Sequence, residues 1–149
     1  MDVKIIDYES KYRDDMLFCY LSAKDALDLG KPTLREDLLD VERHYIAKGN
    51  RFWLAIDEKD RVVGMIGIAI LNDHELRLHR FFVKPSRKSQ GIGTRLLLEV
   101  ENFSKSLGIK RIYTRFSVSY QEAEGFYRAK GFEYVVADRD LVTMALEME

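Results

Sequence analysis

Residues 82–98, FVKPSRKSQGIGTRLLL, decide the fold, because they pass from an apolar segment through a basic, glycine-containing turn into an amphipathic helix. Gly91 and Gly93 introduce this helix, and Gly108 ends it. The apolar stripe of the helix recurs every three or four residues and consists of Ile92, Leu96, Val100, Phe103 and Leu107. The pattern predicts a long helix with one face on a hydrophobic core.

Strand-like segments lie on both sides of this turn and helix. Residues 75–83 precede it and residues 110–116 follow it, so strand, turn, helix and strand predict a parallel crossover. Upstream, residues 52–56 and 62–71 are rich in β-forming residues and are joined by a polar turn, which predicts a hairpin. The residues from 75 to 83 are expected to add a third strand to it.

The two ends of the chain carry shorter patterns. Residues 3–8 predict a first strand, and residues 132–136 and 141–148 predict two final strands, paired antiparallel. A helix capped by Ser10 is expected to follow the first strand and to run to about residue 29.

Two capping-box patterns predict further helices. Thr33 with Glu36 opens a helix that is expected to end at Gly49, and Ser119 with Glu122 opens one that precedes the final strands. All the elements together predict an α/β fold in a single domain over residues 1–149. Its mixed, mainly antiparallel sheet has six to seven strands, with helices on both faces.

Composition excludes several classes of protein. The 149 residues are 46% hydrophobic and 33% charged, with two prolines and nine glycines, which excludes a disordered or collagen-like chain. The longest apolar run has ten residues, where a membrane helix needs about 20. The first residues lack the pattern of a secretory signal, so we expect no membrane association and a cytoplasmic protein.

Cysteine and histidine usage gives no reason to expect a metal. Cys19 lies in an apolar run without a basic neighbour, which indicates a buried structural thiol. His44, His74 and His79 have no paired spacing and no cysteine cluster beside them. We therefore predict no metal site.

The charge is unevenly distributed, although the formal net charge is only −1. No acidic residue lies between Glu75 and Glu99. Six cations lie in that interval: Arg77, Arg80, Lys84, Arg87, Lys88 and Arg95. Because glycines allow close backbone approach and a helix N-terminus offers unpaired N–H groups, the turn is a candidate anion site. A solvated basic edge is the alternative explanation. The turn is neither GxGxxG nor a P-loop, so NAD and ATP are disfavoured.

Two motifs resemble those of the GNAT superfamily of acyl-CoA-dependent N-acyltransferases. Residues 82–98 are similar to its acyl-CoA-binding motif, Val-x-Pro followed by Arg/Gln-x-x-Gly-x-Gly/Ala. A second motif of the family, Ala-x-x-Phe/Leu-Tyr-x-x-x-Gly-Phe, is matched by Ala123, Phe126, Tyr127, Gly131 and Phe132. The resemblance implies an N-acetyltransferase whose two parallel central strands splay apart around acetyl-CoA.

The resemblance also implies which residues bind this cosubstrate. Backbone of Phe81, Phe82 and Val83 would line the pantetheine. The pyrophosphate would rest on Lys88, Ser89, Gln90, Gly91, Ile92, Gly93 and Thr94. Lys88 replaces the family's Arg or Gln, Ser89 replaces a frequent glycine, and Tyr120 replaces an asparagine that often contacts the cofactor.

The reaction needs a proton acceptor and a proton donor. Many family members have a carboxylate six residues before the valine of Val-x-Pro, where this sequence has Arg77. In a regular strand the odd-numbered face carries Glu75, Arg77, His79 and Phe81. We expect Glu75, narrowly ahead of His79, to accept the proton of the amine, and a bulge in the strand would reset this alternation. The resemblance makes Tyr127 the donor to the leaving thiolate, and a core aromatic is its alternative role.

The expected acceptor is a primary amine of a small molecule or peptide. A catalytically idle acyl-CoA-binding sensor is the alternative function, favoured by Arg77 at the usual carboxylate position. Nucleic-acid binding through the basic interval ranks last, because no stacking platform accompanies the cations. Asp25, Asp28, Glu36, Asp37 and Asp40 are either attractors for a cationic amine or solvated helix faces. A homodimer is left open.

Overall fold

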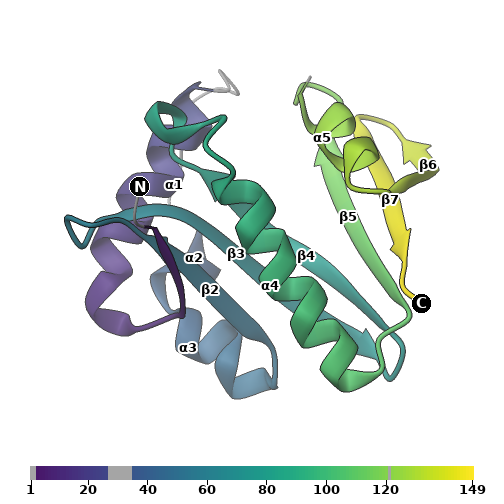
Figure 1. The fold of residues 1–149 in the computed structure, drawn as a ribbon, viewed down its shortest axis with the longest axis horizontal. Coiled ribbons are helices and arrows are strands. Elements are labelled where there is room, and N and C mark those ends of the chain that lie inside the picture. Colours follow the sequence, from purple (N-terminus) through teal and green to yellow (C-terminus); the bar gives the residue numbers. More distant parts are fainter. Residues whose placement is uncertain (1–2, 27–34, 121) are drawn as a thin grey trace.

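The strands form one seven-stranded sheet in the computed structural model, which describes residues 3–26, 35–120 and 122–149 (Figure 1). In spatial order they are β1 (Lys4–Asp7), β2 (Arg51–Ile56), β3 (Val62–Asn72), β4 (Glu75–Val83), β5 (Arg111–Ser117), β7 (Leu141–Glu147) and β6 (Glu133–Asp138). All neighbouring strands are antiparallel except the central pair β4 and β5, which are parallel. The expected mixed, mainly antiparallel sheet is confirmed.

Helices cover both faces of this sheet. They are α1 (Arg13–Ala26), α2 (Glu36–Leu39), α3 (Val41–His44), α4 (Ile92–Leu107) and α5 (Ala123–Ala129), with 3-10 turns η1 (Ser10–Tyr12), η2 (Ile46–Lys48) and η3 (Pro85–Arg87). One hydrophobic cluster joins α4 and α5 to the sheet and includes Leu96, Val100 and Tyr127. A second cluster joins α1, α2 and α3 to it and includes Met16, Leu38 and Val41. The expectation of helices on both faces is therefore confirmed.

The helix that follows the basic turn has the predicted extent. Its residues Ile92, Leu96 and Val100 are buried, and Gly108 ends it with a φ of 74°. The N-cap is Gly91, whose φ of 80° lies in the left-handed region that glycine adopts without steric cost. The hairpin of β2 and β3 is also confirmed.

The helix caps expected at Ser10 and Ser119 are wrong, and one expected helix is divided in two. The helix expected up to Gly49 is divided at Asp40, whose backbone (φ −146°, ψ 77°) ends α2, while its carboxylate caps α3. Thr33 lies outside the described residues. Ser10 begins a 3-10 turn without capping a helix, and Glu122, not Ser119, is the N-cap of α5. The helix divides at Asp40 because its carboxylate accepts the backbone N–H of Arg43 and so caps the start of α3.

The central parallel strands pair over only three residues. Glu75 to Arg77 of β4 are in register with Arg111 to Tyr113 of β5, and no pairing continues beyond them. Figure 1 shows the two strands diverging from this point toward the top of the view. The splayed central pair is confirmed, and residues 78–83 of β4 face no strand on that side.

A bulge changes which side chains of β4 share a face. Met65 pairs with Phe82 and Gly67 pairs with His79, so β4 has one more residue than β3 in this interval. Arg80 lies in it with a φ of 52°. Phe81 consequently packs in the α4-side cluster, and its predicted place on the face of His79 is wrong.

Candidate functional site

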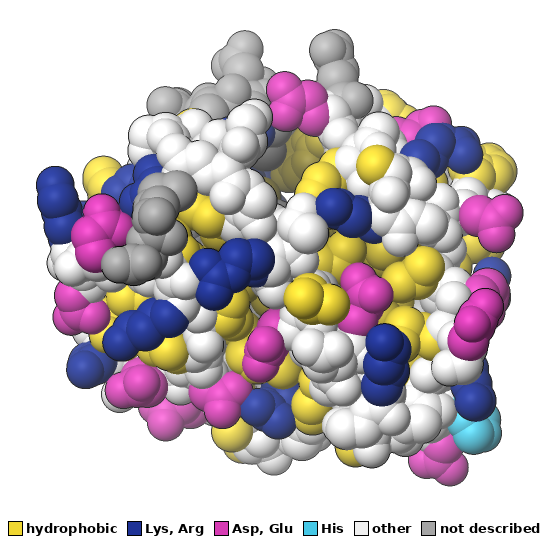
Figure 2. Space-filling model, in the orientation of Figure 1, with side chains coloured by type: hydrophobic (Ala, Val, Ile, Leu, Met, Phe, Trp, Pro, Cys, Tyr) yellow, Lys and Arg dark blue, Asp and Glu magenta, His cyan; other side chains and the backbone are white. Residues whose placement is uncertain are grey.

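A cavity of about 810 Å³ occupies the space between the diverging halves of β4 and β5. Its walls come from β4, β5, the basic turn, α5 and the end of α1. Figure 2 shows the surface hollowed at the top of the view, with hydrophobic side chains on the floor of the hollow. A ligand that enters here meets strand backbone on two sides, because the parallel pairing has ended at Arg77 and Tyr113.

The basic turn closes one end of the cavity. All of the predicted turn residues line it except Gln90, and they include Lys88, Ser89, Gly91 and Thr94. No side chain caps the N-terminus of α4, so the first N–H groups of this 16-residue helix are open to a ligand. Ser89 has a φ of 64°, which shows that the position usually occupied by glycine does require the left-handed conformation. The turn combines backbone donors, a helix dipole and the Lys88 ammonium group, a set suited to phosphate oxygens.

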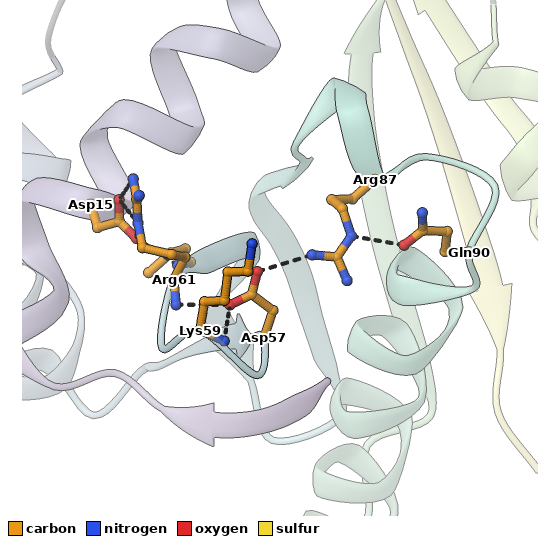
Figure 3. A network of polar contacts seen from close by, with 7 residues as sticks. Asp15, Asp57, Lys59, Arg61, Arg87 and Gln90 are labelled. Carbon is orange, nitrogen blue, oxygen red and sulfur yellow. Dashed lines mark hydrogen bonds and ion pairs between the residues drawn. The ribbon is translucent and has the colours of Figure 1, made fainter. Parts of the chain in front are cut away.

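An ion pair fastens this turn to the β2–β3 hairpin (Figure 3). The Arg87 guanidinium lies 3.0 Å from the Asp57 carboxylate, and both side chains are largely buried. Arg87 also donates to the amide oxygen of Gln90 at 2.8 Å. Asp57 further accepts the backbone N–H groups of Lys59 and Arg61. Burial alone would raise the pKa of Asp57, but these hydrogen bonds and Arg87 hold that pKa below its usual value. The carboxylate is thus charged at neutral pH.

Tyr127 lies in an aromatic wall of the cavity. Its ring stacks on Phe116 with centroids 5.6 Å apart, makes edge contacts with Phe81 and Phe126, and packs at a tilt against Phe132. Burial raises the pKa of Tyr127 to about 12, while a hydrogen bond with the Thr114 side chain acts in the opposite direction. The phenol therefore keeps its proton at neutral pH and can donate it as a hydrogen bond.

His79 also lines the cavity, on the face of β4 that carries Arg77 and Arg80. Burial, Arg77 and Arg80 lower the pKa of His79 to about 4, so the imidazole is neutral at pH 7. Its Nε2 atom accepts a hydrogen bond from Nε of Arg77 at 3.2 Å. The lone pair that a general base would use is therefore already engaged.

Glu75 is not brought to the cavity. It is the first residue of β4, and its carboxylate accepts hydrogen bonds from Asn72 at 2.9 Å and from the Tyr113 hydroxyl at 2.9 Å. These two hydrogen bonds are the main reason that its pKa is lowered. The expected base thus stays ionised at the paired end of the central strands, away from the lining residues.

The cavity lining is strongly basic. Within the described residues, Glu122 is the one acid that lines it, against seven cations: Lys24, Arg35, Arg80, Arg87, Lys88, Arg115 and Lys130. Asp37 is occupied by Arg80, with two contacts of 2.9 Å, and by the Tyr45 hydroxyl. Asp40 caps α3. Asp28 and the side chain of Asp25 lie outside the described residues.

Among the residues that the structure describes, no group of three His, Cys, Asp or Glu side chains could hold a metal ion. In the same residues no helix has the length and apolarity of a membrane span. Burial raises the pKa of the Cys19 thiol to about 12, which fits the expected structural role.

Three contributors to the site were not identified from the sequence. Asp57 lies 30 positions from Arg87 in an ordinary hairpin turn. Thr114 and Arg115 belong to β5, where alternation alone shows that they face opposite sides of the sheet. An isolated acid in a tight turn is a weak signal, because most such acids only bond their own backbone.

Comparisons with known proteins agree with this geometry. The model of the Acetyltransferase (GNAT) family matches residues 13–132. N-acetyltransferase 8 of Homo sapiens is 28% identical over 120 residues, which are 76% of this chain and 52% of that protein. The probable N-acetyltransferase camello of Xenopus laevis is 37% identical over 103 residues, which are 66% of this chain and 46% of that protein. The chain thus spans about half the length of these relatives.

Solved structures share the whole fold. A GNAT-family acetyltransferase from Staphylococcus aureus Mu50 superposes with a TM-score of 0.89 and 26% identity, over 99% of this chain and all of the other. PaiA N-acetyltransferase from Thermoplasma acidophilum, solved in complex with coenzyme A, superposes with a TM-score of 0.87 and 19% identity over the same shares of the two chains.

Proposed function

This chain belongs to the acetyltransferase (GNAT) family, and on that premise we propose that it transfers an acetyl group from acetyl-CoA to a primary amine of a small molecule or peptide. The observation that carries the proposal is the end of β4–β5 pairing at Arg77 and Tyr113, which opens a cavity between strands. An extended pantetheine arm needs backbone partners and apolar walls, and the unpaired segment of β4 with its aromatic neighbours offers both.

Acetyl-CoA fits the residues that line this cavity. Backbone of Phe81, Phe82 and Val83 would hold the pantetheine, since all three line the cavity on the unpaired side of β4. The pyrophosphate would bind the turn from Lys88 to Thr94, which Arg87 braces through its hydrogen bond to Gln90 and its ion pair with Asp57. The bound thioester supplies the activated acetyl group.

Tyr127 would act as hydrogen-bond donor to the departing thiolate. It lines the cavity, is protonated at neutral pH, and is held in place by four aromatic rings and by Thr114. This role agrees with its place in the second family motif.

The amine must lose a proton, because less than about 0.1% of an alkyl amine with pKa 10.4 is neutral at pH 7. Glu75 is bonded elsewhere, and the acceptor atom of His79 is engaged by Arg77. We therefore assign proton removal to water at the cavity mouth, with neither residue as the base. Glu75→Gln and His79→Gln would each leave the pH profile of kcat/KM unchanged under this assignment.

The proposal is tested by calorimetric titration with acetyl-CoA and by thiol release with a panel of primary amines. Binding together with amine-dependent thiol release supports it. The alternative is an acyl-CoA-binding sensor without turnover, which is favoured by Arg77 at the place of the usual carboxylate. Binding without thiol release from any amine would support that alternative. Absence of acetyl-CoA binding would refute both.

A further inference from the structure

The sheet face that carries His79, here called the acceptor face, has an arginine pair that the proposed acetyl transfer does not use: Arg115 lines the cavity, and Arg77 lies beside the lining residues. Arg77 is the last residue of β4 that pairs with β5, and its register partner is Tyr113. Arg115 is two residues beyond Tyr113 and therefore on the same face of β5. Both side chains belong to the face that carries His79, opposite the face of Tyr127.

The charges of this pair lack a counterion in the described part of the chain. The Arg77 side chain bonds His79, a neutral partner, and no carboxylate there forms an ion pair with Arg77 or Arg115. The acids on this face are bonded to other groups: Asp37 accepts two hydrogen bonds from Arg80, and Glu75 accepts hydrogen bonds from Asn72 and Tyr113. Burial lowers the pKa of Arg77, and the neighbouring Arg115 lowers it further, because a second cation nearby disfavours the charged form.

The rim of the same face adds a further cation. Lys24, at the end of α1, lines the cavity and donates to the Tyr120 hydroxyl at 3.0 Å. A cationic acceptor such as a polyamine would meet repulsion on this route, whereas an anionic group would be attracted.

We propose that the acceptor is an amine that also carries an anionic group, such as an α-amino acid, and that Arg77 and Arg115 bind this group. The inference rests on the proposed acetyl transfer and specifies its substrate class. A planar guanidinium matches a carboxylate with two parallel hydrogen bonds, and Arg77 retains its terminal N–H groups for this purpose. Arg77 lies two residues, or about 7 Å, along the strand from His79, which lines the cavity.

The first test compares acceptors that differ only in the anionic group. Alanine, leucine, phenylalanine and glutamate are each assayed against the corresponding α-amide, with the matching 1-aminoalkylphosphonates as a third arm. We expect kcat/KM about tenfold or more higher for each acid than for its amide, because a charge-assisted pair is lost. Preference for the phosphonate arm would identify phosphate-type anions as the better match.

The second test uses variants of the arginine pair. Arg77→Gln and Arg115→Gln are expected to lower the acid-to-amide ratio of kcat/KM about tenfold each, and Arg77→Lys should lower it less because the charge remains. The affinity for acetyl-CoA should stay within about twofold. Arg128→Gln removes the same charge from an exposed pair with Glu124 outside the cavity, so the ratio should not change.

The third test does not depend on turnover. An anion bound between Arg77 and Arg115 would neutralise charges that hold the pKa of His79 down, so NMR titration of His79 should show that pKa rising with an amino acid and not with its amide. Equal kcat/KM for acids and amides would overturn the inference. A His79 pKa that changes with neither the amino acid nor its amide would also overturn it. If the parent protein does not bind acetyl-CoA, the proposed function is refuted. The His79 titration would then still show whether Arg77 and Arg115 bind an anion.

Discussion

Replacing Tyr127 with phenylalanine removes one hydroxyl from the aromatic wall while the ring packing against Phe116 and Phe132 is kept. Burial raises the pKa of Tyr127 to about 12, whereas a free thiol has a pKa near 8.5. Full proton transfer from the phenol to the thiolate is therefore uphill by about 3.5 pKa units, or about 5 kcal/mol. The hydroxyl can only stabilise the thiolate through a hydrogen bond.

This limits the expected effect of Tyr127→Phe. Positioned acid catalysis accelerates a reaction about 10²- to 10⁴-fold. A hydroxyl that donates a hydrogen bond without releasing its proton should contribute at or below the lower end of this range. We therefore expect Tyr127→Phe to lower the turnover rate about 10- to 100-fold. The affinity for acetyl-CoA should not change. Loss of the Thr114 hydrogen bond should lower the free energy of unfolding by only about 1 kcal/mol.

The assay is single-turnover thiol release with saturating acetyl-CoA, so that product release does not limit the rate. Urea unfolding of the same variant measures its stability separately. Tyr134→Phe is the matched control, because Tyr134 is exposed on β6 and is not among the residues that line the cavity. Undiminished turnover of Tyr127→Phe would reduce Tyr127 to a packing residue.

Three further predictions concern the turn and the acceptor face. Gly91→Ala should weaken acetyl-CoA binding and lower the free energy of unfolding in urea by about 1–2 kcal/mol, because the φ of 80° at this position is unfavourable for alanine. Gly125→Ala within α5 is the control and should not lower the free energy of unfolding. Equal effects of the two substitutions would contradict this prediction. Asp57→Asn should lower acetyl-CoA affinity in calorimetry and the free energy of unfolding by about 2–3 kcal/mol, since the largely buried ion pair between Arg87 and Asp57 is lost. An unchanged affinity would show that this ion pair does not position the turn. For His79, the folded pKa of about 4 lies below the unfolded value near 6.5, so the unfolded chain binds more protons in that interval and stability should fall as pH drops from 6.5 to 4. His79→Gln should flatten this part of the stability profile, and a profile equal to that of the parent would refute the assignment.

The sequence by itself determined the elements whose pattern is strong and local. α4 has the predicted glycine boundaries and the predicted stripe from Ile92 to Phe103, whereas Leu107 is exposed, and β4 has the predicted residues 75–83. Periodic burial leaves each of these two elements one stable arrangement. The two short motifs around Gly91 and Tyr127 also indicated the family, since both depend on residues close together in the chain.

Tertiary structure alone decided the contacts between distant segments. The bulge at Arg80 moved Phe81 to the other face of β4, because pairing with β3 set the register there. Asp57 acquired its role through Arg87, 30 positions away. The alternation of side chains along β4 made Glu75 a candidate for the general base. At Glu75, however, β4 still pairs with β5, and the cavity opens only beyond Arg77. Where the strands separate depends on the packing of the helices on both faces, which no local pattern in the sequence specifies.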